Sequence, residues 1–285
     1  MSEPLLDEEY REIFRAADDL FQKPLVWSRS VPAPSGTTLV SLVKFRVFVR
    51  AVKQYSSIVQ LLRSGQWEDA LVLARSLYEL NANLSEICSS NSEQAASSFV
   101  KFGKCQQLRL ERRLLEDQVR DEKLKPQPSA ETLLELKQKV AAITLVLNRD
   151  FGEFRTKERQ GNKGNKNGKW QDTWSGFSVE KLAQRLAEKT GGKPGQSDYF
   201  VYALGSHFTH AAPGALFLGF NPSRETADWN EFRVVLDRAG QGGLRVCLRQ
   251  ASVHLVDIIG LAGDSIMGYE PQWFDEFALP LLEKF

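Results

Sequence analysis

Side chains that could carry out chemistry stand one helical turn apart in two segments of this chain. In the segment from Ala74 to Leu80, Arg75 and Glu79 are four residues apart, so a helix would place them on one face. The segment from Tyr202 to His210 holds two of the three histidines, and a helix would align four polar side chains there: Tyr202, Ser206, Thr209 and His210. Because histidine titrates near neutral pH, His210 is a candidate general acid or base.

Each of these two rows has two interpretations. Arg75 and Glu79 adjoin an apolar stripe, so they form either a solvated ion pair or a half-buried pair at the mouth of a polar pocket. The second row is either a buried hydrogen-bonded cluster or a site where His210 activates Ser206, which would also need a third, orienting group. The His207-x-x-His210 spacing suits a metal only with a further ligand, and nothing in the sequence brings one there, so we assign no metal and no cofactor.

A basic segment follows the predicted helices of the N-terminal half. Between residues 155 and 169, cationic side chains stand against Glu158 alone, and the glycine- and asparagine-rich composition predicts a flexible loop. This loop is either a solvated connection or a phosphate-binding element with tryptophan available for base stacking. The candidate ligand-binding residues are Arg155, Lys157, Arg159, Lys163, Lys166, Lys169 and Trp174.

Almost every periodic stretch of the chain predicts a helix. Pro24 is expected to end the first helix, while Thr37 or Thr38, Ser129 and Ser178 are expected N-caps. The strand-like run at residues 215–220 is short. The predicted helices cover residues 8–22, 38–64, 66–88, 92–122, 129–148, 178–189, a segment around 202–210, and two C-terminal stretches, 225–238 and 244–267.

These helices predict an all-α fold, an irregular multi-helix bundle with one long flexible basic loop. We expect a single domain over residues 1–285, which combines an N-terminal helix and loop (1–36), a long-helix core (37–151), the basic loop (152–176) and C-terminal helices that complete the core (177–285).

The bulk composition excludes several classes of protein. The net charge of +1 argues against a uniformly basic surface, and three widely spaced cysteines argue against a disulfide framework. No apolar stretch reaches the ~20 uninterrupted residues of a membrane span. We therefore expect a soluble cytoplasmic protein with no membrane partner.

Three short motifs resemble the pattern of an uncharacterised bacterial family, domain of unknown function 5677. They are Arg75-Ser-Leu-Tyr-Glu79, Trp174-Ser-Gly-Phe-Ser178, and Tyr202 followed by Ser206 and His210. The resemblance covers about Leu61 to Pro213. It implies no activity, but it implies that five residues form one polar cluster: Arg75, Glu79, Tyr202, Ser206 and His210.

The segment Arg249-Gln-Ala-Ser-Val-His254 is similar to the arginine–histidine signature of HEPN ribonucleases, all-α proteins of toxin and antiviral systems. That resemblance implies RNA cleavage without a metal at a dimer interface, where arginine and histidine of two chains meet. Arg249 would then stabilise charge on a phosphate, and His254 would move protons. Because apolar residues surround His254 in sequence, a core histidine with satisfied hydrogen bonds is the alternative.

Two functions fit these observations. In the first, the chain is a metal-independent ribonuclease of a bacterial defence or toxin system, a homodimer, with RNA or another nucleic acid as its partner. His210 or His254 would transfer protons, Arg75 or Arg249 would hold phosphate, and the basic loop would attract RNA. The alternative is a non-enzymatic interaction module, in which the polar cluster locks helices together and the charged stretch 109–125 recruits a partner.

Overall fold

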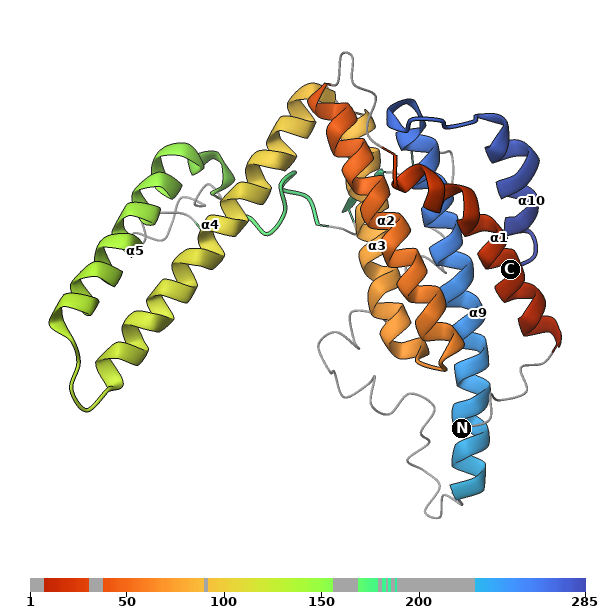
Figure 1. Cartoon of the computed structure of the whole chain (residues 1–285), viewed down its shortest axis with the longest axis horizontal. Helices are drawn as coiled ribbons and strands as arrows, with labels where there is room; N and C mark the ends of the chain where they lie inside the picture. Colours follow the sequence, from red (N-terminus) through yellow and green to blue (C-terminus); the bar gives the residue numbers. More distant parts are fainter. Residues whose placement is uncertain are drawn as a thin grey trace. The chain divides into compact units, whose positions relative to one another are not determined.

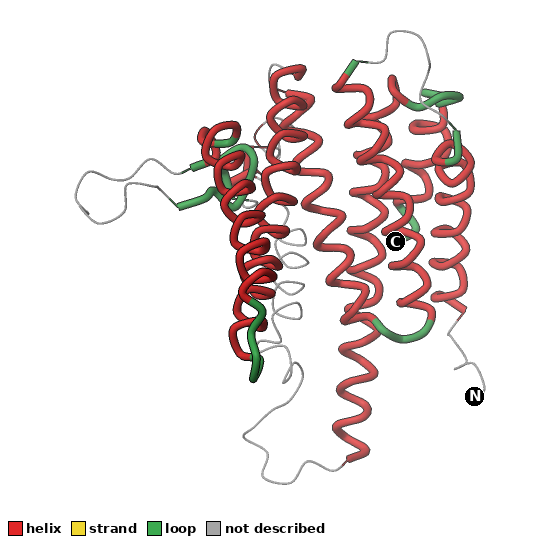
Figure 2. Tube along the Cα trace, turned by 60° about the vertical axis from the view of Figure 1, so that its left-hand side comes forward, coloured by secondary structure: helices red, strands yellow, loops and turns green. Residues whose placement is uncertain are grey.

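Helices account for most of the described part of the chain, as the sequence predicts. The computed structural model describes residues 8–30, 38–89, 92–155, 169–178, 181–182, 184–185, 188 and 229–285, with only the backbone of 8–9 and 229–242. Within these residues no strand occurs (Figure 2), and the single β-bridge joins Arg155 to Trp170. The chain divides into two compact units: unit 1 comprises Met1–Ser92 and Leu182–Phe285, and unit 2 comprises Glu93–Lys181. The all-α prediction is confirmed, and the single-domain assignment stays a prediction.

Three helices form the centre of unit 1: α2 (Leu39–Arg63), α3 (Trp67–Ser89) and α9 (Trp229–Ala262) (Figure 1). A tight turn joins α2 to the antiparallel α3, and Gly65 in that turn has φ +77, a conformation that favours glycine. Contacts at both ends show that α9 runs parallel to α3: Gly243 lies against Trp67, and Cys88 lies near the carbonyl of Leu261. The core of the unit is the set of side chains buried between these helices.

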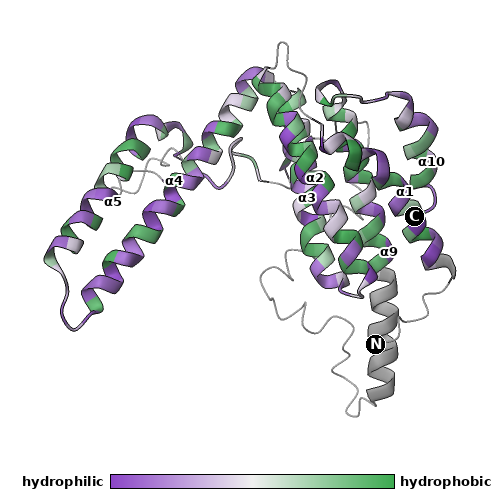
Figure 3. Cartoon of the chain, in the orientation of Figure 1, coloured by the Kyte–Doolittle hydropathy of each residue, from purple (hydrophilic) through white to green (hydrophobic). Residues whose placement is uncertain are grey.

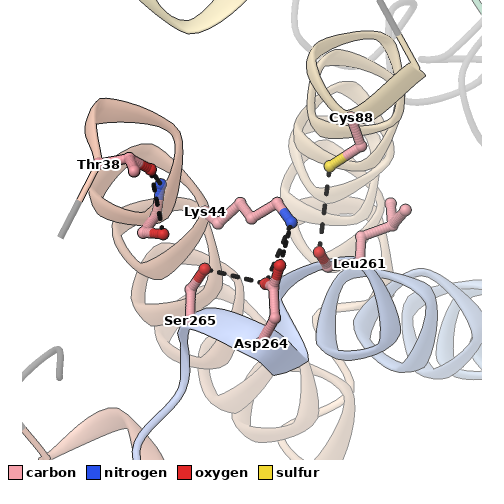
Figure 4. A network of polar contacts seen from close by, with 7 residues as sticks. Thr38, Lys44, Cys88, Leu261, Asp264 and Ser265 are labelled. Carbon is pink, nitrogen blue, oxygen red and sulfur yellow. Dashed lines mark hydrogen bonds and ion pairs between the residues drawn. The ribbon is translucent and has the colours of Figure 1, made fainter. Parts of the chain in front are cut away.

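Local sequence signals explain where α2 begins and how its first turns are held. Thr38 is the N-cap, and its hydroxyl accepts a hydrogen bond from the backbone N–H of Ser41 at 3.2 Å. One turn later the mostly buried Lys44 ammonium reaches Asp264 at 2.8 Å, just beyond the end of α9 (Figure 4). This ion pair ties the start of α2 to the short 3-10 turn Gly263–Ser265.

An outer layer of unit 1 covers these three helices. It consists of α1 (Glu8–Ser28), a π-helical turn (Phe274–Ala278) and α10 (Leu279–Leu282). The rings of Trp27 and Trp273 meet edge-on with centroids 5.3 Å apart, so aromatic packing holds α1 against the C-terminal segment.

The prediction that Pro24 ends the first helix is wrong, because α1 continues to Ser28 with Pro24 inside it. A proline removes one backbone hydrogen bond, but its fixed φ remains compatible with a helix. Leu20 and Trp27, seven residues apart on either side of Pro24, are both buried. Burial of this apolar face on both sides outweighs the lost hydrogen bond.

The prediction of two C-terminal helices is also wrong, because one continuous α9 spans the glycine-rich stretch between them. Glycine costs only about 1 kcal/mol relative to alanine inside a helix, so tertiary packing can override it. Gly243 shows what that packing is: a Cβ there would lie 2.6 Å from Cε3 of Trp67. Glycine therefore lets the tryptophan ring of α3 touch the backbone of α9.

Part of α9 has the length and apolar composition of a membrane span. The stretch Gly243–Ser265 meets both criteria, but about two thirds of it is buried inside the fold. Burial of that kind is typical of the core helix of a soluble protein.

Unit 2 is a helical hairpin of α4 (Ser92–Leu124) and α5 (Ala130–Asp150). Ser129 caps α5 as predicted, since its hydroxyl accepts a hydrogen bond from the backbone N–H of Thr132 at 3.2 Å. The carboxylate of Glu122 accepts a hydrogen bond from the backbone N–H of Ser129 at 3.0 Å, which holds the connecting turn. The core of this unit is a small apolar cluster: Phe102, Cys105, Leu147, Phe151 and Phe154.

Both ends of the predicted flexible loop, 152–176, are held in place. Residues Gly152–Phe154 form a 3-10 turn, and the backbone N–H of Gln171 donates to the carbonyl of Phe154 at 2.8 Å. Trp170 and Trp174 pack against the apolar cluster. The aromatic side chains at these two ends are therefore part of the core of unit 2, and the flexibility of the loop stays a prediction. Residues 156–168 lie outside the described residues.

Candidate functional site

A row of polar contacts between α3 and α9 centres on the buried side chain of Asn81. Its amide nitrogen lies 3.2 Å from Nδ1 of His254 and donates to Oδ2 of Asp257 at 3.0 Å. Its amide oxygen lies 3.4 Å from the hydroxyl of Ser85, which donates to it. Asn81 occupies a position in the apolar stripe of α3, so burying its amide without such partners would cost free energy.

These contacts also determine the state of His254. The amide nitrogen of Asn81 can only donate, so Nδ1 of His254 accepts and the ring proton is assigned to Nε2. Burial lowers the pKa of His254 to about 4, which keeps the ring neutral near pH 7. The ring also meets Tyr78 edge-on, with centroids 5.1 Å apart. Because the basic lone pair already serves Asn81, the observed geometry suits helix packing better than proton abstraction.

Arg75 and Glu79 lie beside this row on α3 and form an ion pair, with Nε 3.2 Å from Oε1. The exposed fractions of their side chains are 19% and 35%, so the pair is half-buried. Of the two interpretations of this spacing, a half-buried pair describes the geometry, and a fully solvated pair does not. A half-buried guanidinium next to a carboxylate can orient an anionic ligand or hold a neighbouring helix.

A second ion pair extends the polar row toward the end of α3. Arg185 donates two hydrogen bonds to the buried carboxylate of Glu86, at 2.9 and 3.2 Å. This bidentate geometry is the strongest form of an arginine–carboxylate contact. Arg185 comes from the segment that follows Ser178, whose hydroxyl accepts a hydrogen bond from the backbone N–H of Lys181 at 3.2 Å, as expected of an N-cap. The pair therefore fixes that segment against α3.

The structure separates the arginine and histidine of the HEPN-like motif. Arg249 is exposed, whereas His254 is 3% exposed and faces α3. Five residues correspond to about 140° around a helix axis, so the two side chains leave α9 in different directions. The other predicted members of the cluster, Tyr202, Ser206 and His210, lie outside the described residues.

Among the described residues, no three His, Cys, Asp or Glu side chains converge as metal ligands would. His207 and His210, which have metal-pair spacing in the sequence, lie outside that part of the chain. Cys88 and Cys247 are unsuited to binding as thiolates, because burial raises the pKa of each thiol.

Unit 2 carries a different kind of candidate site, a surface of cations and aromatic rings that we call the basic–aromatic surface. The guanidinium of Arg155 lies over the ring of Trp170 at 4.2 Å, and that of Arg109 lies 5.5 Å from the same ring. Arg155 also donates to Oδ1 of Asn148 at 2.5 Å. The surface comprises Arg109, Arg155, Lys169, Trp170 and Trp174, and three of its members, Arg155, Lys169 and Trp174, belong to the predicted ligand-binding set. The rest of that set, Lys157, Arg159, Lys163 and Lys166, lies outside the described residues.

Sequence reasoning missed Asn81, Arg185 and Asp257 as members of the polar row. One signal was available for Asn81, because an amide inside an apolar helical stripe must find a buried partner. Arg185 and Asp257 had no comparable signal, since single charged residues on helices are most often solvated.

The fold and the polar row define an all-α protein whose three central helices are held together by buried hydrogen bonds. The chain belongs to a family of unknown function, DUF5677, whose model matches residues 42–225. The match encloses the three motifs that resembled this family and ends before α9, so His254 and Asp257 lie outside it. No curated protein and no solved structure matches the chain. The HEPN resemblance stays a prediction.

Proposed function

We propose that this protein binds single-stranded nucleic acid, RNA in the first place, through the basic–aromatic surface of unit 2. The observation that carries the proposal is the uneven charge of the chain. Unit 2 contains 18 basic and 13 acidic residues, whereas unit 1 contains 19 basic and 23 acidic residues. The near-neutral net charge of the whole chain is therefore the sum of a basic unit 2 and an acidic unit 1. The excess positive charge of unit 2 attracts the phosphate backbone of a nucleic acid.

The side chains around Trp170 supply the second requirement of single-strand binding. Bases stack on aromatic and guanidinium planes without regard to sequence, while neighbouring cations hold the phosphates. Half-buried Trp170 with Arg109 and Arg155 forms such a stacked group, and the exposed Lys169 directly precedes Trp170 in the sequence. Lys157, Arg159, Lys163 and Lys166 add four further charges between Arg155 and Lys169.

Cleavage of the bound RNA is a separate hypothesis that concerns unit 1. His254 is a poor proton-transfer group, because it is buried, neutral and engaged by Asn81. In a ribonuclease the proton-transfer role therefore falls to His210, and the phosphate-holding role to Arg75, which is half-buried beside Glu79.

The binding proposal is tested with fluorescence anisotropy of a labelled single-stranded RNA oligonucleotide. We expect the triple variant R109A/R155A/K169A, which removes three charges of the basic–aromatic surface, to bind at least about tenfold more weakly than the wild type at moderate salt. The slope of log K against log salt should fall by about 2, because three phosphate contacts are lost.

The matched control is K123A/K137A/K139A, which removes the same charge from the distal half of the α4–α5 hairpin. It should change the affinity by no more than about twofold, because it leaves the proposed surface intact. Equal weakening by the two triple variants would show a non-specific charge effect and overturn the proposal. In the same samples, RNA that is cut by the wild type and left intact by His210→Ala would establish the nuclease step.

A further inference from the structure

Two stripes that contain apolar residues run along α5, and only one of them packs against α4 in the hairpin. The inner stripe faces α4 and its side chains are half-buried or buried: Leu133, Leu136, Val140, Ile143 and Leu147. The outer stripe follows the same alternating spacing on the far side of α5, at Leu134, Gln138, Ala141, Leu145 and Asn148. Leu134 and Leu145 are 59% and 62% exposed (Figure 3 shows apolar residues along α5). Leu134, Ala141 and Leu145 are the apolar members of the outer stripe, at spacings of seven and four residues. Such spacings match those of the apolar positions in the contact seam of a coiled coil.

The outer stripe has the shape of a contact surface. Ala141 lies at its centre and Leu145 beside it, and together with Thr144, Asn148 and Arg149 they line a shallow depression. A small residue at the centre lets another helix approach closely, and large residues toward the ends fill the space on either side. A surface of this form fits a helix better than a flat sheet or a small molecule.

We propose that a second copy of this chain occupies the outer stripe, with the two α5 helices packed antiparallel in a homodimer. The stripe is complementary to itself when it is reversed about the point midway between residues 139 and 140. Reversal places Leu134 of one copy opposite Leu145 of the other, at both ends of the seam. A two-fold axis beside the middle of α5 therefore buries one pair of leucines at each end of the seam.

The charges beside the stripe are complementary within one residue of the same register. Glu131 and Arg149 stand on one flank of the stripe, nine residues on either side of Val140. In an antiparallel pair each flank faces the same flank of the partner, so Glu131 of one copy meets Arg149 of the other, twice by symmetry. Within one copy Arg149 is paired with Asp150, with Nε 2.7 Å from Oδ1. A guanidinium has five donors, so Arg149 can contact both carboxylates.

The expected interface is small. The span from Glu131 to Arg149 is about 27 Å long at the helical rise of 1.5 Å per residue. One helical stripe of that length buries less than the ~800 Å² per partner of a standard interface. The dimer should therefore be weak and visible as a concentration-dependent equilibrium.

Sedimentation velocity of the full-length chain over a range of concentrations tests the proposal. We expect a monomer–dimer equilibrium in the wild type and at least about tenfold weaker association in L134E/L145E. The matched control is L110E/L114E, which charges two equally exposed leucines on α4 and should leave association unchanged. Far-UV circular dichroism establishes that all variants keep their helices.

A charge exchange tests the register. E131R and R149E should each weaken association, because each places like charges opposite one another, and E131R/R149E should restore it. A chain that is monomeric at every concentration would overturn the proposal. So would equal loss in the α4 control, or a double charge variant that stays as weak as the single variants.

Discussion

The two units of this protein place polar and apolar side chains in opposite ways. Unit 1 keeps polar groups inside, where Asn81, His254 and the Tyr55–Ser252 pair at 2.9 Å form buried hydrogen bonds between helices. Unit 2 leaves large apolar side chains outside, including Leu110, Leu114, Leu134 and Leu145, and it carries the excess of basic residues. The difference teaches that buried polar contacts specify the fold of unit 1, whereas our two proposals assign partners to the exposed apolar and basic side chains of unit 2.

The largest expected effect compares one leucine from each unit. Leu84→Ala in unit 1 should lower the free energy of unfolding by about 3 kcal/mol, because Leu84 is fully buried and its removal leaves a cavity. Leu134→Ala in unit 2 should change it by less than about 0.5 kcal/mol. Urea denaturation followed by circular dichroism measures both. Equal effects would mean that the two leucines are equally buried in solution.

The pH dependence of unit 1 should depend on its buried histidine. The pKa of His254 is about 4 in the folded chain and 6.5 in the unfolded chain, so only the unfolded chain binds the proton between these values. Stability should therefore fall as the pH falls from about 6.5 to 4, by up to about 3 kcal/mol. Denaturation at a series of pH values in wild type and His254→Gln measures the difference between the two curves. An identical pH slope in both proteins would contradict burial of a neutral histidine.

The third prediction concerns the amide that joins α3 to α9. Asn81→Ala should cost about 2 kcal/mol, because it leaves Nδ1 of His254 without this donor and also removes the contact with Asp257. Asn83→Ala is the control, since the half-buried Asn83 donates to the carbonyl of Glu79 in its own helix. Thermal or chemical denaturation should show the smaller loss for Asn83. A larger loss of stability for Asn83→Ala than for Asn81→Ala would contradict the prediction, because the contact within α3 would then matter more than the contact between α3 and α9.

The smallest expected effects concern the helix caps of the two units. Ser129→Ala at α5 and Thr38→Ala at α2 should each cost about 1 kcal/mol, because each removes one side-chain acceptor of a backbone N–H. Hydrogen exchange of the backbone amides distinguishes the two variants by where protection is lost. Protection should be lost at the first turn of α5 in Ser129→Ala and at the first turn of α2 in Thr38→Ala. Faster exchange throughout both units after either change would argue against their separate stability.

Local signals in the sequence predicted most of the helices and their ends. Thr38, Ser129 and Ser178 mark their positions correctly because capping depends on a few neighbouring residues. The same local reasoning failed at Pro24 and at the glycines before Leu244, where packing across the core decides the outcome. The contact between Gly243 and Trp67 joins residues far apart in the chain, so periodicity within one segment cannot reveal it.

The candidate site was harder to predict than the fold. Helical spacing correctly paired Arg75 with Glu79, since a side chain and its neighbour one turn away meet in any helix. The partners of His254 come from α3, and no spacing within α9 points to them. In the structure His254 contacts Asn81, and this contact depends on the register of two helices that are distant in the sequence.

Because a β-bridge joins Arg155 to Trp170, we expect the segment between these two residues to tolerate insertions. Because the two ends are already held together, the fold does not depend on how long the connection is. Closing a flexible connection twice as long costs only about 0.6 kcal/mol more. A reporter peptide inserted after residue 163 should therefore leave the helices intact while it moves the neighbouring lysines apart. Such an insertion separates the contribution of this segment to RNA affinity from any contribution to folding.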